Sequence, residues 1–422
     1  MAADGLAARG AAVEILGAVL GERRLLAEVL AESAGPLASL GPGDRARAQR
    51  LVTVTLRHLE QADRVLAPHL RKPPPRSVVN TLRAALVESA VLGAPSHGVV
   101  NAAVDLTRRG RKTGHMTGFV NAVLRKVLAE PEPFAGMAPQ KLPQWLRQPL
   151  VRAWGREAVA AMEAVHALPP PLDLTPMPGA ALVPGAELLP TGSWRLMDAG
   201  QVSALPGYAT GDWWVQNAAA ALPARVLDPQ RGERVLDLCA APGGKTLQIA
   251  ATGAEVTAID ISGPRMARFE RNLARTGLPA ALVVADALQW QPGAVFDAVL
   301  LDAPCSASGT VRRHPDLPFV KDGSELPALV DLQARLIDRA LTLLRPGGRM
   351  VFCTCSLLPE EGEGQISAAL ARHPGLVVER PEVAGIDPAW ITPEGGLRLR
   401  PDFWAERGGM DGFYIARLRR GH

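Results

Sequence analysis

The first 130 residues place apolar side chains at the three- and four-residue spacing of helices, and no alternating strand pattern interrupts them. Asp44 can cap a helix that runs from Arg45 to about Leu70. Further helix starts are indicated by the prolines at 73–75, by Ser96 and by Gly118. We therefore predict an all-helical domain over residues 1–130.

Residues 131–210 are rich in proline and glycine, which favours a connecting region with a small subdomain of short strands. From about Val215 short apolar strands alternate with helices, a pattern typical of a parallel, doubly wound sheet. The predicted strands are 234–238, 255–260, 281–286, 296–302, 349–354 and 413–418. We therefore predict a Rossmann-like α/β domain over residues 211–422.

A glycine turn follows the first predicted strand, at Pro242-Gly243-Gly244. It is not a phosphate-binding P-loop, because Cys239 stands where that loop needs glycine, and the dinucleotide pattern G-x-G-x-x-G is absent too. Asp260 ends the second strand and can accept hydrogen bonds from both ribose hydroxyls of a nucleoside, and Asp286 ends the third and can reach an adenine amino group. Each feature alone is common in tight turns and helix caps. Together they favour an adenosine-containing ligand without a triphosphate, and S-adenosylmethionine fits best.

The four cysteines are too few for a disulfide framework, and all lie in the C-terminal half. Cys305 follows the fourth strand and Cys355 the fifth, so their thiols are expected to face one pocket. A thiolate beside a methyl donor suits covalent activation of an unreactive carbon such as carbon 5 of cytosine. The alternative is that the cysteines are buried structural residues. The spacing of Cys353 and Cys355 and the lack of a histidine cluster disfavour zinc.

The net charge is only +4, so the distribution of charge matters more than its sum. Between Asn101 and Glu130 the chain holds only two acids and six basic residues: Arg108, Arg109, Arg111, Lys112, Arg125 and Lys126. This run indicates either an RNA-binding surface or a solvated helix face. No segment has the roughly 18 to 20 apolar residues of a membrane span, and the N-terminus lacks a signal-peptide pattern. We expect a cytoplasmic protein, and a monomer.

Three blocks resemble the signature motifs of the NOL1/NOP2/Sun family of RNA cytosine methyltransferases. They are the stretch Leu236 to Thr246, the stretch Asp302 to Gly309 followed by Arg312-Arg313-His314-Pro315-Asp316, and Thr354-Cys355-Ser356. Asp44-Arg45 and the stretch Gly118 to Arg125 resemble a NusB-like RNA-binding domain, which is fused to the bacterial small-subunit rRNA members of that family. The resemblance is weakest over residues 131–211. It implies a Rossmann-like, S-adenosylmethionine-dependent methyltransferase that acts on 16S rRNA.

The resemblance also implies roles for individual residues. Cys355 is expected to attack cytosine, Cys305 to assist product release, and Asp302 to contact the cofactor and hold the cytosine ring. The other expected cofactor contacts are Cys239, Ala240, Ala241, Pro242, Gly243, Gly244, Lys245, Asp260 and Asp286. Arg312 and Arg313 join the six basic residues named above as candidate RNA contacts.

Two departures from the family pattern stand out. Gly362 replaces the usual asparagine, and Cys353 is outside the motif and is read as a strand residue. The alternatives are a cytosine methyltransferase of tRNA or another RNA, which the NusB-like domain disfavours, and a non-catalytic rRNA assembly factor, which the intact Asp302, Cys305 and Cys355 disfavour.

Overall fold

The computed structural model describes residues 5–421, which divide into two compact units. The first unit contains residues 5–148, Val159–Ala167 and Val311–Asp322. The second contains Pro149–Ala158, Leu168–Thr310 and residues 323–421. The units are thus not simple consecutive stretches of chain, because a short segment from the C-terminal half, Val311–Asp322, packs with the N-terminal helices.

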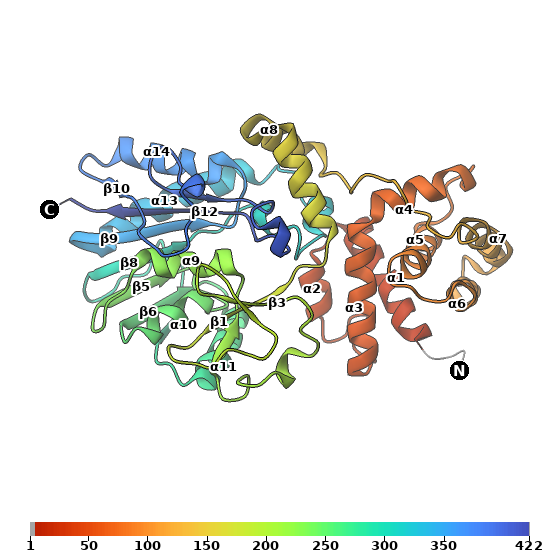
Figure 1. The fold of residues 1–422 in the computed structure, drawn as a ribbon, viewed down its shortest axis with the longest axis horizontal. Helices are drawn as coiled ribbons and strands as arrows, with labels where there is room; N and C mark the ends of the chain where they lie inside the picture. Colours follow the sequence, from red (N-terminus) through yellow and green to blue (C-terminus); the bar gives the residue numbers. More distant parts are fainter. Residues whose placement is uncertain (1–4, 422) are drawn as a thin grey trace. The chain divides into compact units, whose positions relative to one another are not determined.

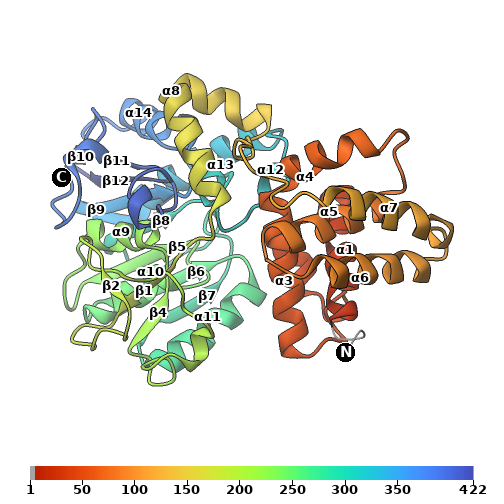
Figure 2. The same ribbon diagram turned by 45° about the vertical axis from the view of Figure 1, so that its right-hand side comes forward.

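The first unit is helical (Figure 2). Its helices are α1 (Leu6–Glu22), α2 (Leu26–Ala31), α3 (Pro42–Arg57), α4 (Leu59–Leu66), α5 (Arg76–Ala90), α6 (Ser96–Arg109), α7 (Thr117–Val127) and α12 (Leu317–Val320). One apolar cluster joins α1, α2 and α3, and a second joins α4 to α7. The single helix predicted from Arg45 to Leu70 is interrupted at His58, whose backbone leaves the helical conformation.

Helix α8 (Gln144–Ala167) is bent, and its parts belong to different units. The bend lies at Gly155, where φ is 83° and ψ is 163°. Such a left-handed φ is open to glycine and costly for other residues. Pro149 inside the helix removes one more backbone hydrogen bond.

The second unit begins with a small antiparallel sheet of order β2-β3-β1-β4. Its strands are β1 (Leu172–Pro176), β2 (Glu187–Leu188), β3 (Trp194–Leu196) and β4 (Trp213–Val215). Asp173 and Arg195 form a fully buried ion pair in this sheet, with 2.7 Å between Oδ1 and Nε. Asp173 also accepts hydrogen bonds from Asn217 and from the backbone of Ala218, so it fixes the start of the next helix.

The large sheet has the order β10-β12-β9-β8-β5-β6-β7, and β11 also pairs with β12. Its strands are β5 (Arg234–Leu238), β6 (Glu255–Asp260), β7 (Ala281–Val284), β8 (Phe296–Asp302), β9 (Leu344–Thr354), β10 (Val377–Glu379), β11 (Leu397–Leu399) and β12 (Phe413–Arg419). Strands β5 to β9 are parallel, and β12 is antiparallel to β9. The strand order reverses at β5, which lies between β6 and β8, and ligands bind beyond the strand ends at such a point.

Helices cover both faces of this sheet (Figure 1). They are α9 (Ala218–Leu227), α10 (Gly244–Ala251), α11 (Gly263–Thr276), α13 (Leu326–Leu343) and α14 (Glu363–Arg372). Alternate residues of β8 and β9 enter different cores, as the two-residue period of a strand requires. Leu301 and Phe352 pack in the core with α13 and α14, whereas Leu300 and Val351 pack in the core with α9 and α10.

The predicted parallel sheet is confirmed for β5 to β9, whereas β12 runs antiparallel to β9, and β10 and β11 were not predicted. The third predicted strand ends at Val284, two residues before Asp286, and the fifth begins earlier than predicted, at Leu344. Among the described residues, no helix has the length and apolarity to cross a membrane.

Candidate active site

The predicted cofactor residues Cys239 to Lys245 form the turn between β5 and α10. Cys239 has a φ of 61°, which residues other than glycine rarely adopt, and Gly243 has a φ of 99°. A Cβ atom on Gly243 would collide with the ring of Phe269. The backbone N–H of Ala240 donates to the carbonyl of Ile259 at 2.9 Å, so the turn is tied to the end of β6.

Asp260 is the last residue of β6 and lies against this turn. Its Oδ2 accepts a hydrogen bond from the backbone of Ala241 at 3.1 Å, and its Oδ1 accepts one from Ser262 at 2.9 Å. Asp286 lies in the loop after β7, where its Oδ1 accepts a hydrogen bond from the backbone of Leu288 at 2.9 Å. Asp260 thus lies at the end of β6 and Asp286 just beyond the end of β7, at the same edge of the sheet.

Lys245 and Asp302 link α10 to the end of β8, with 2.7 Å between Nζ and Oδ2. Burial alone would lower the pKa of Lys245, but the charge and the hydrogen bond of Asp302, together with other nearby acidic groups, outweigh burial and hold this pKa above its ordinary value. Asp237 is fully buried nearby and accepts a hydrogen bond from Thr246 at 2.6 Å, and burial raises its pKa to about 7. The edge of the sheet therefore holds several carboxyl groups around one ammonium group.

Cys305 and Cys355 are in contact, with 3.5 Å between their Sγ atoms. They follow the adjacent parallel strands β8 and β9, and the N–H of Gly309 donates to the carbonyl of Cys355 at 2.9 Å. The hydrogen bond with Cys355, followed by burial, raises the pKa of Cys305 well above its ordinary value. Cys305 is therefore held as a neutral thiol beside the sulfur of Cys355.

Cys353 is a core residue of β9 and is fully buried. Its Sγ donates to Oδ1 of Asp302 at 3.4 Å, and burial raises its pKa well above the ordinary value. Among the described residues, no group of three or more His, Cys, Asp or Glu side chains is arranged to hold a metal ion.

Glu361 was not among the sequence-predicted site residues, but it lies between the two cysteine loops. It is fully buried and accepts hydrogen bonds from Ser306 and Ser356, the residues that follow Cys305 and Cys355. In the sequence, only its position six residues after Cys355, inside the Glu360–Glu363 block, could have drawn attention to it.

The departure at Gly362 has a local explanation. A Cβ atom there would collide with Nη2 of Arg398 and with the Tyr414 side chain. Arg398 binds Glu363 through two hydrogen bonds and also donates to the carbonyl of Ser356. In this chain a buried guanidinium therefore occupies the space beside Gly362.

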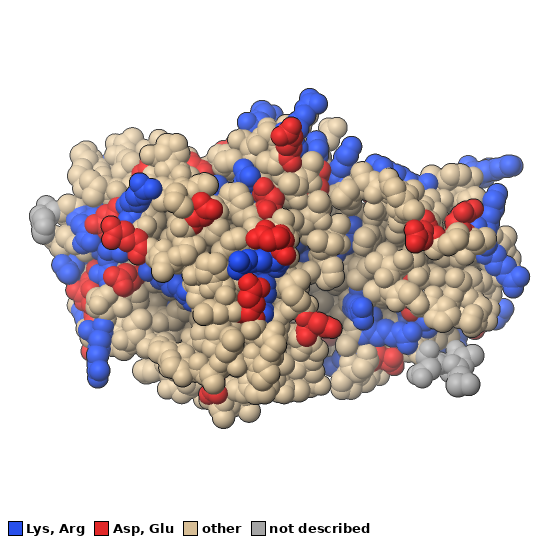
Figure 3. Space-filling model, viewed as in Figure 1, with Lys and Arg blue, Asp and Glu red and all other residues tan. Residues whose placement is uncertain are grey.

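The six basic residues predicted to bind RNA are all exposed, on α6, on α7 and on the segment between them. Arg108 forms an ion pair with Asp105, with 2.6 Å between Nη1 and Oδ1. Figure 3 shows Lys and Arg side chains gathered at the right-hand end of the face drawn, where Figure 1 places α6 and α7.

The other two candidate RNA contacts differ from each other. Arg313 is exposed, whereas Arg312 is fully buried in the first unit, so its guanidinium is not placed to meet an RNA phosphate. The carbonyl of Arg312 accepts a hydrogen bond from Arg57 at 2.8 Å. Adjacent charges alone suggested two RNA contacts, but the fold gives one of them an interior position.

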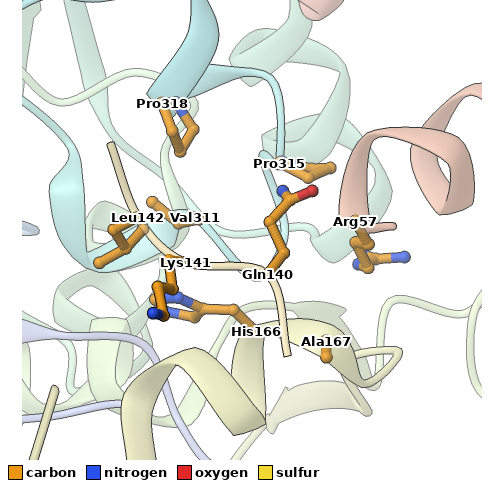
Figure 4. A pocket seen from close by; sticks show the side chains of 9 residues that line it. All are labelled: Arg57, Gln140, Lys141, Leu142, His166, Ala167, Val311, Pro315 and Pro318. Atoms are coloured by element: carbon orange, nitrogen blue, oxygen red, sulfur yellow. The ribbon is translucent and has the colours of Figure 1, made fainter. Parts of the chain in front are cut away.

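The segment Val311–Asp322 is held inside the first unit by several contacts. Asp316 accepts a hydrogen bond from the backbone of Leu26 at 2.9 Å, and Phe319 packs on the cluster of α1 to α3. The segment also lines a small cavity (Figure 4), together with residues from α3, α8 and the stretch before α8. This cavity has a volume of about 20 Å³, enough for roughly one water molecule and too small for a substrate.

An open, mainly parallel sheet with a glycine turn, acids and a thiol pair at one edge defines a protein of the Rossmann-like methyltransferase class. The profile of the family "16S rRNA methyltransferase RsmB/F" matches residues 224–419, and that of the NusB family matches residues 6–129. The chain belongs to the RsmB/F family of 16S rRNA methyltransferases.

Full-length relatives support this membership. A ribosomal RNA small subunit methyltransferase B from Xanthomonas campestris is 37% identical over 88% of this chain and 89% of its own. The protein of the same name from Xylella fastidiosa is 34% identical over 98% of both chains.

Solved structures agree with the fold. A methyltransferase homolog protein from Pyrococcus horikoshii is 26% identical, with a TM-score of 0.55 over 65% of this chain and 93% of that one. A second crystal structure, at 22% identity, covers 98% of this chain and 99% of that one with a TM-score of 0.75, which shows the fold alone.

Proposed function

We propose that this protein transfers a methyl group from S-adenosylmethionine to carbon 5 of a cytosine in 16S rRNA through a covalent intermediate with Cys355. The observation that carries the proposal is the contact between Cys305 and Cys355 at the ends of β8 and β9. Within a family of rRNA methyltransferases, two thiols at the substrate edge of the sheet suit covalent activation of a pyrimidine.

The edge of the sheet suits S-adenosylmethionine as the methyl donor. The positive φ angles of Cys239 and Gly243 give the turn after β5 a compact backbone, which allows a ligand to lie close to it. Asp260 and Asp286 would bind the ribose hydroxyls and the adenine amino group. The excess of carboxyl groups over Lys245 also suits a ligand whose sulfonium and ammonium groups are positive. When bound, the cofactor supplies the methyl group.

The two cysteines would act at different stages. The Sγ of Cys355 adds to carbon 6 of cytosine, and the ring electrons then make carbon 5 nucleophilic enough to be methylated. The proton on carbon 5 then passes to a base, the sulfur of Cys355 leaves carbon 6 as a thiolate, and the double bond between carbons 5 and 6 is restored. Cys305 lies in contact with Cys355 and is placed to assist this elimination. Asp302 would hold the cytosine ring during the attack.

Alanine substitutions of the cysteines test this assignment. Cys355→Ala is expected to abolish both methylation and any covalent protein–RNA adduct, because no sulfur remains to attack carbon 6. Cys305→Ala is expected to allow attack and methylation but to stall elimination. It should therefore accumulate an RNA-linked band that survives denaturing electrophoresis.

Cys353→Ala is the matched control, because it removes a buried thiol from β9, the strand that Cys355 follows, without touching the pair. It should retain methylation and form no stable adduct. An adduct with Cys355→Ala but not with Cys305→Ala would reverse the two roles. Full activity of both single variants would exclude the covalent mechanism.

The substrate is tested separately by bisulfite sequencing of RNA from a strain without this protein. The expected result is the loss of one 5-methylcytosine from 16S rRNA. A loss confined to tRNA or another RNA would replace the proposed substrate, and no loss at all would favour a non-catalytic assembly role.

A further inference from the structure

A single buried carboxylate connects the loops that carry the two cysteines. Oε1 of Glu361 accepts hydrogen bonds from the backbone of Ser306 at 2.8 Å and from Gln333 at 3.0 Å. Oε2 accepts hydrogen bonds from the hydroxyls of Ser306 and Ser356, both at 2.5 Å. Each cysteine is thus one peptide bond away from a residue that Glu361 holds.

Further hydrogen bonds connect the residues next to each cysteine with Gln333 and with the backbone of Glu361. Gln333 also donates to the carbonyl of Pro304 at 2.8 Å, so the residues on both sides of Cys305 are tied to α13 and Glu361. Thr354, the residue before Cys355, donates its hydroxyl to the backbone carbonyl of Glu361 at 2.9 Å. Both cysteines are therefore flanked on both sides by residues bound to Glu361 or Gln333.

We propose that Glu361 is a positioning residue that holds the Cys305 and Cys355 loops in register, so that the two sulfur atoms stay in contact through the reaction. The proposal rests on the function proposed above and deepens it. Four charge-assisted hydrogen bonds to one buried carboxylate fix a geometry that two independent loops would not keep. A displacement of about 1 Å in such a site can cost about a hundredfold in rate.

The charge of Glu361 gives this role a second measurable consequence. Besides the hydrogen bond with Cys355 and burial, that charge contributes to raising the pKa of Cys305. Removing the charge while keeping the side-chain shape should therefore lower the pKa of Cys305. This effect distinguishes Glu361 from a residue that only adds stability.

Two substitutions separate the contacts from the charge. Glu361→Ala removes all four hydrogen bonds, and we expect kcat to fall about a hundredfold with KM for RNA within about twofold. The stalled covalent adduct should accumulate even though both cysteines are present.

Glu361→Gln keeps the shape of the side chain and can still bind both serines, so it should recover most of kcat. In Glu361→Gln, alkylation of Cys305 by iodoacetamide, followed by mass spectrometry, should begin at a lower pH than in the unaltered chain.

The contact between the thiols of Cys305 and Cys355 can also be measured by an assay that does not depend on methyl transfer. Phenylarsine oxide condenses with two neighbouring thiols and releases water, and we expect Glu361→Ala to weaken its binding as much as Cys305→Ala does. The matched control is Glu360→Ala, which replaces an exposed acid beside Glu361. It should change neither kcat nor the binding of phenylarsine oxide. If the alanine variant does not fold, the pH of Cys305 alkylation in Glu361→Gln decides the question.

The outcomes distinguish the two proposals. If the unaltered chain makes no 5-methylcytosine but thiol capture depends on Glu361, the proposed function fails and the positioning role stands. If the chain methylates RNA while Glu361→Ala keeps its kcat and its arsenical binding, the positioning role is wrong. An unchanged pH of Cys305 alkylation in a folded Glu361→Gln would overturn it as well.

Discussion

The four cysteines have different neighbours, and these neighbours predict different reactivities. Cys353 packs in the core of the sheet and donates to Asp302. Burial and the charges of Asp302 and Asp260 raise the pKa of Cys239. Because a thiol must ionise to act as a nucleophile, neither is poised for attack. Cys305 and Cys355 instead lie in contact with each other, at the ends of the adjacent strands β8 and β9.

Asp260 is expected to set the affinity for S-adenosylmethionine. Asp260→Ala would remove charge-assisted hydrogen bonds to the ribose, worth roughly 1.5–3 kcal/mol each. It would also release the backbone of Ala241 from the strand end. Calorimetric titration should therefore show affinity at least about tenfold weaker.

Two further variants make the Asp260 test specific. Asp260→Asn keeps one acceptor oxygen and should give an intermediate affinity. Glu270→Ala, an exposed acid on the following helix α11, should leave the affinity unchanged. A change within about twofold for Asp260→Ala would mean that the ribose lies elsewhere.

At the scale of elements, the sequence predicts those features that depend only on neighbouring residues in the chain. The strands from β5 to β9 follow from apolar runs bounded by glycine and proline, and the residues at their ends follow with them. Glu361 could not be predicted in this way, because it stands in an acidic run that resembles a solvated turn. Its burial depends on Ser306 and Gln333, which lie 55 and 28 residues away. The interior position of Arg312 likewise depends on helices far away in the sequence.

The placement of Val311–Asp322 among the helices gives a prediction about α2. This helix has only six residues, and Asp316 supplies the acceptor for the backbone N–H of its first residue, Leu26. Asp316 is buried, so Asp316→Ala should cost about 0.5–2 kcal/mol, as the loss of a helix cap does. Chemical denaturation of the full chain, followed by circular dichroism, measures the change.

A neighbouring acid provides the control for Asp316. Asp322 lies in the same segment but forms an exposed ion pair with Arg23, at 3.0 Å between Oδ2 and Nη1. Exposed pairs contribute little, so Asp322→Ala should cost less than about 0.5 kcal/mol. Equal losses for the two variants would argue against a capping role for Asp316.

At the scale of the whole molecule, a small net charge conceals an uneven distribution. Many arginines of the second unit are paired with acids, as Arg349 is with Glu233 and Arg417 with Glu379. The six basic residues of α6, α7 and the intervening segment are instead exposed with few acids near them in sequence. RNA phosphates favour such a surface, because each phosphate that a basic side chain neutralises releases a condensed counterion.

Charge reversal tests whether this basic surface binds rRNA. Replacing Arg109, Arg111 and Lys126 by glutamate should weaken binding and reduce the slope of log affinity against log salt by roughly 0.7–0.9 for each phosphate that is no longer neutralised. Fluorescence anisotropy with a 16S rRNA fragment over a range of salt concentrations measures both quantities.

The control reverses three exposed arginines of α11 and α13, Arg268, Arg271 and Arg335. It changes the net charge by the same amount, so any weakening shared with it reports long-range charge alone. A reduced slope confined to the α6–α7 variant would assign the phosphate contacts to this surface, whereas an unchanged slope would make it an ordinary solvated helix face.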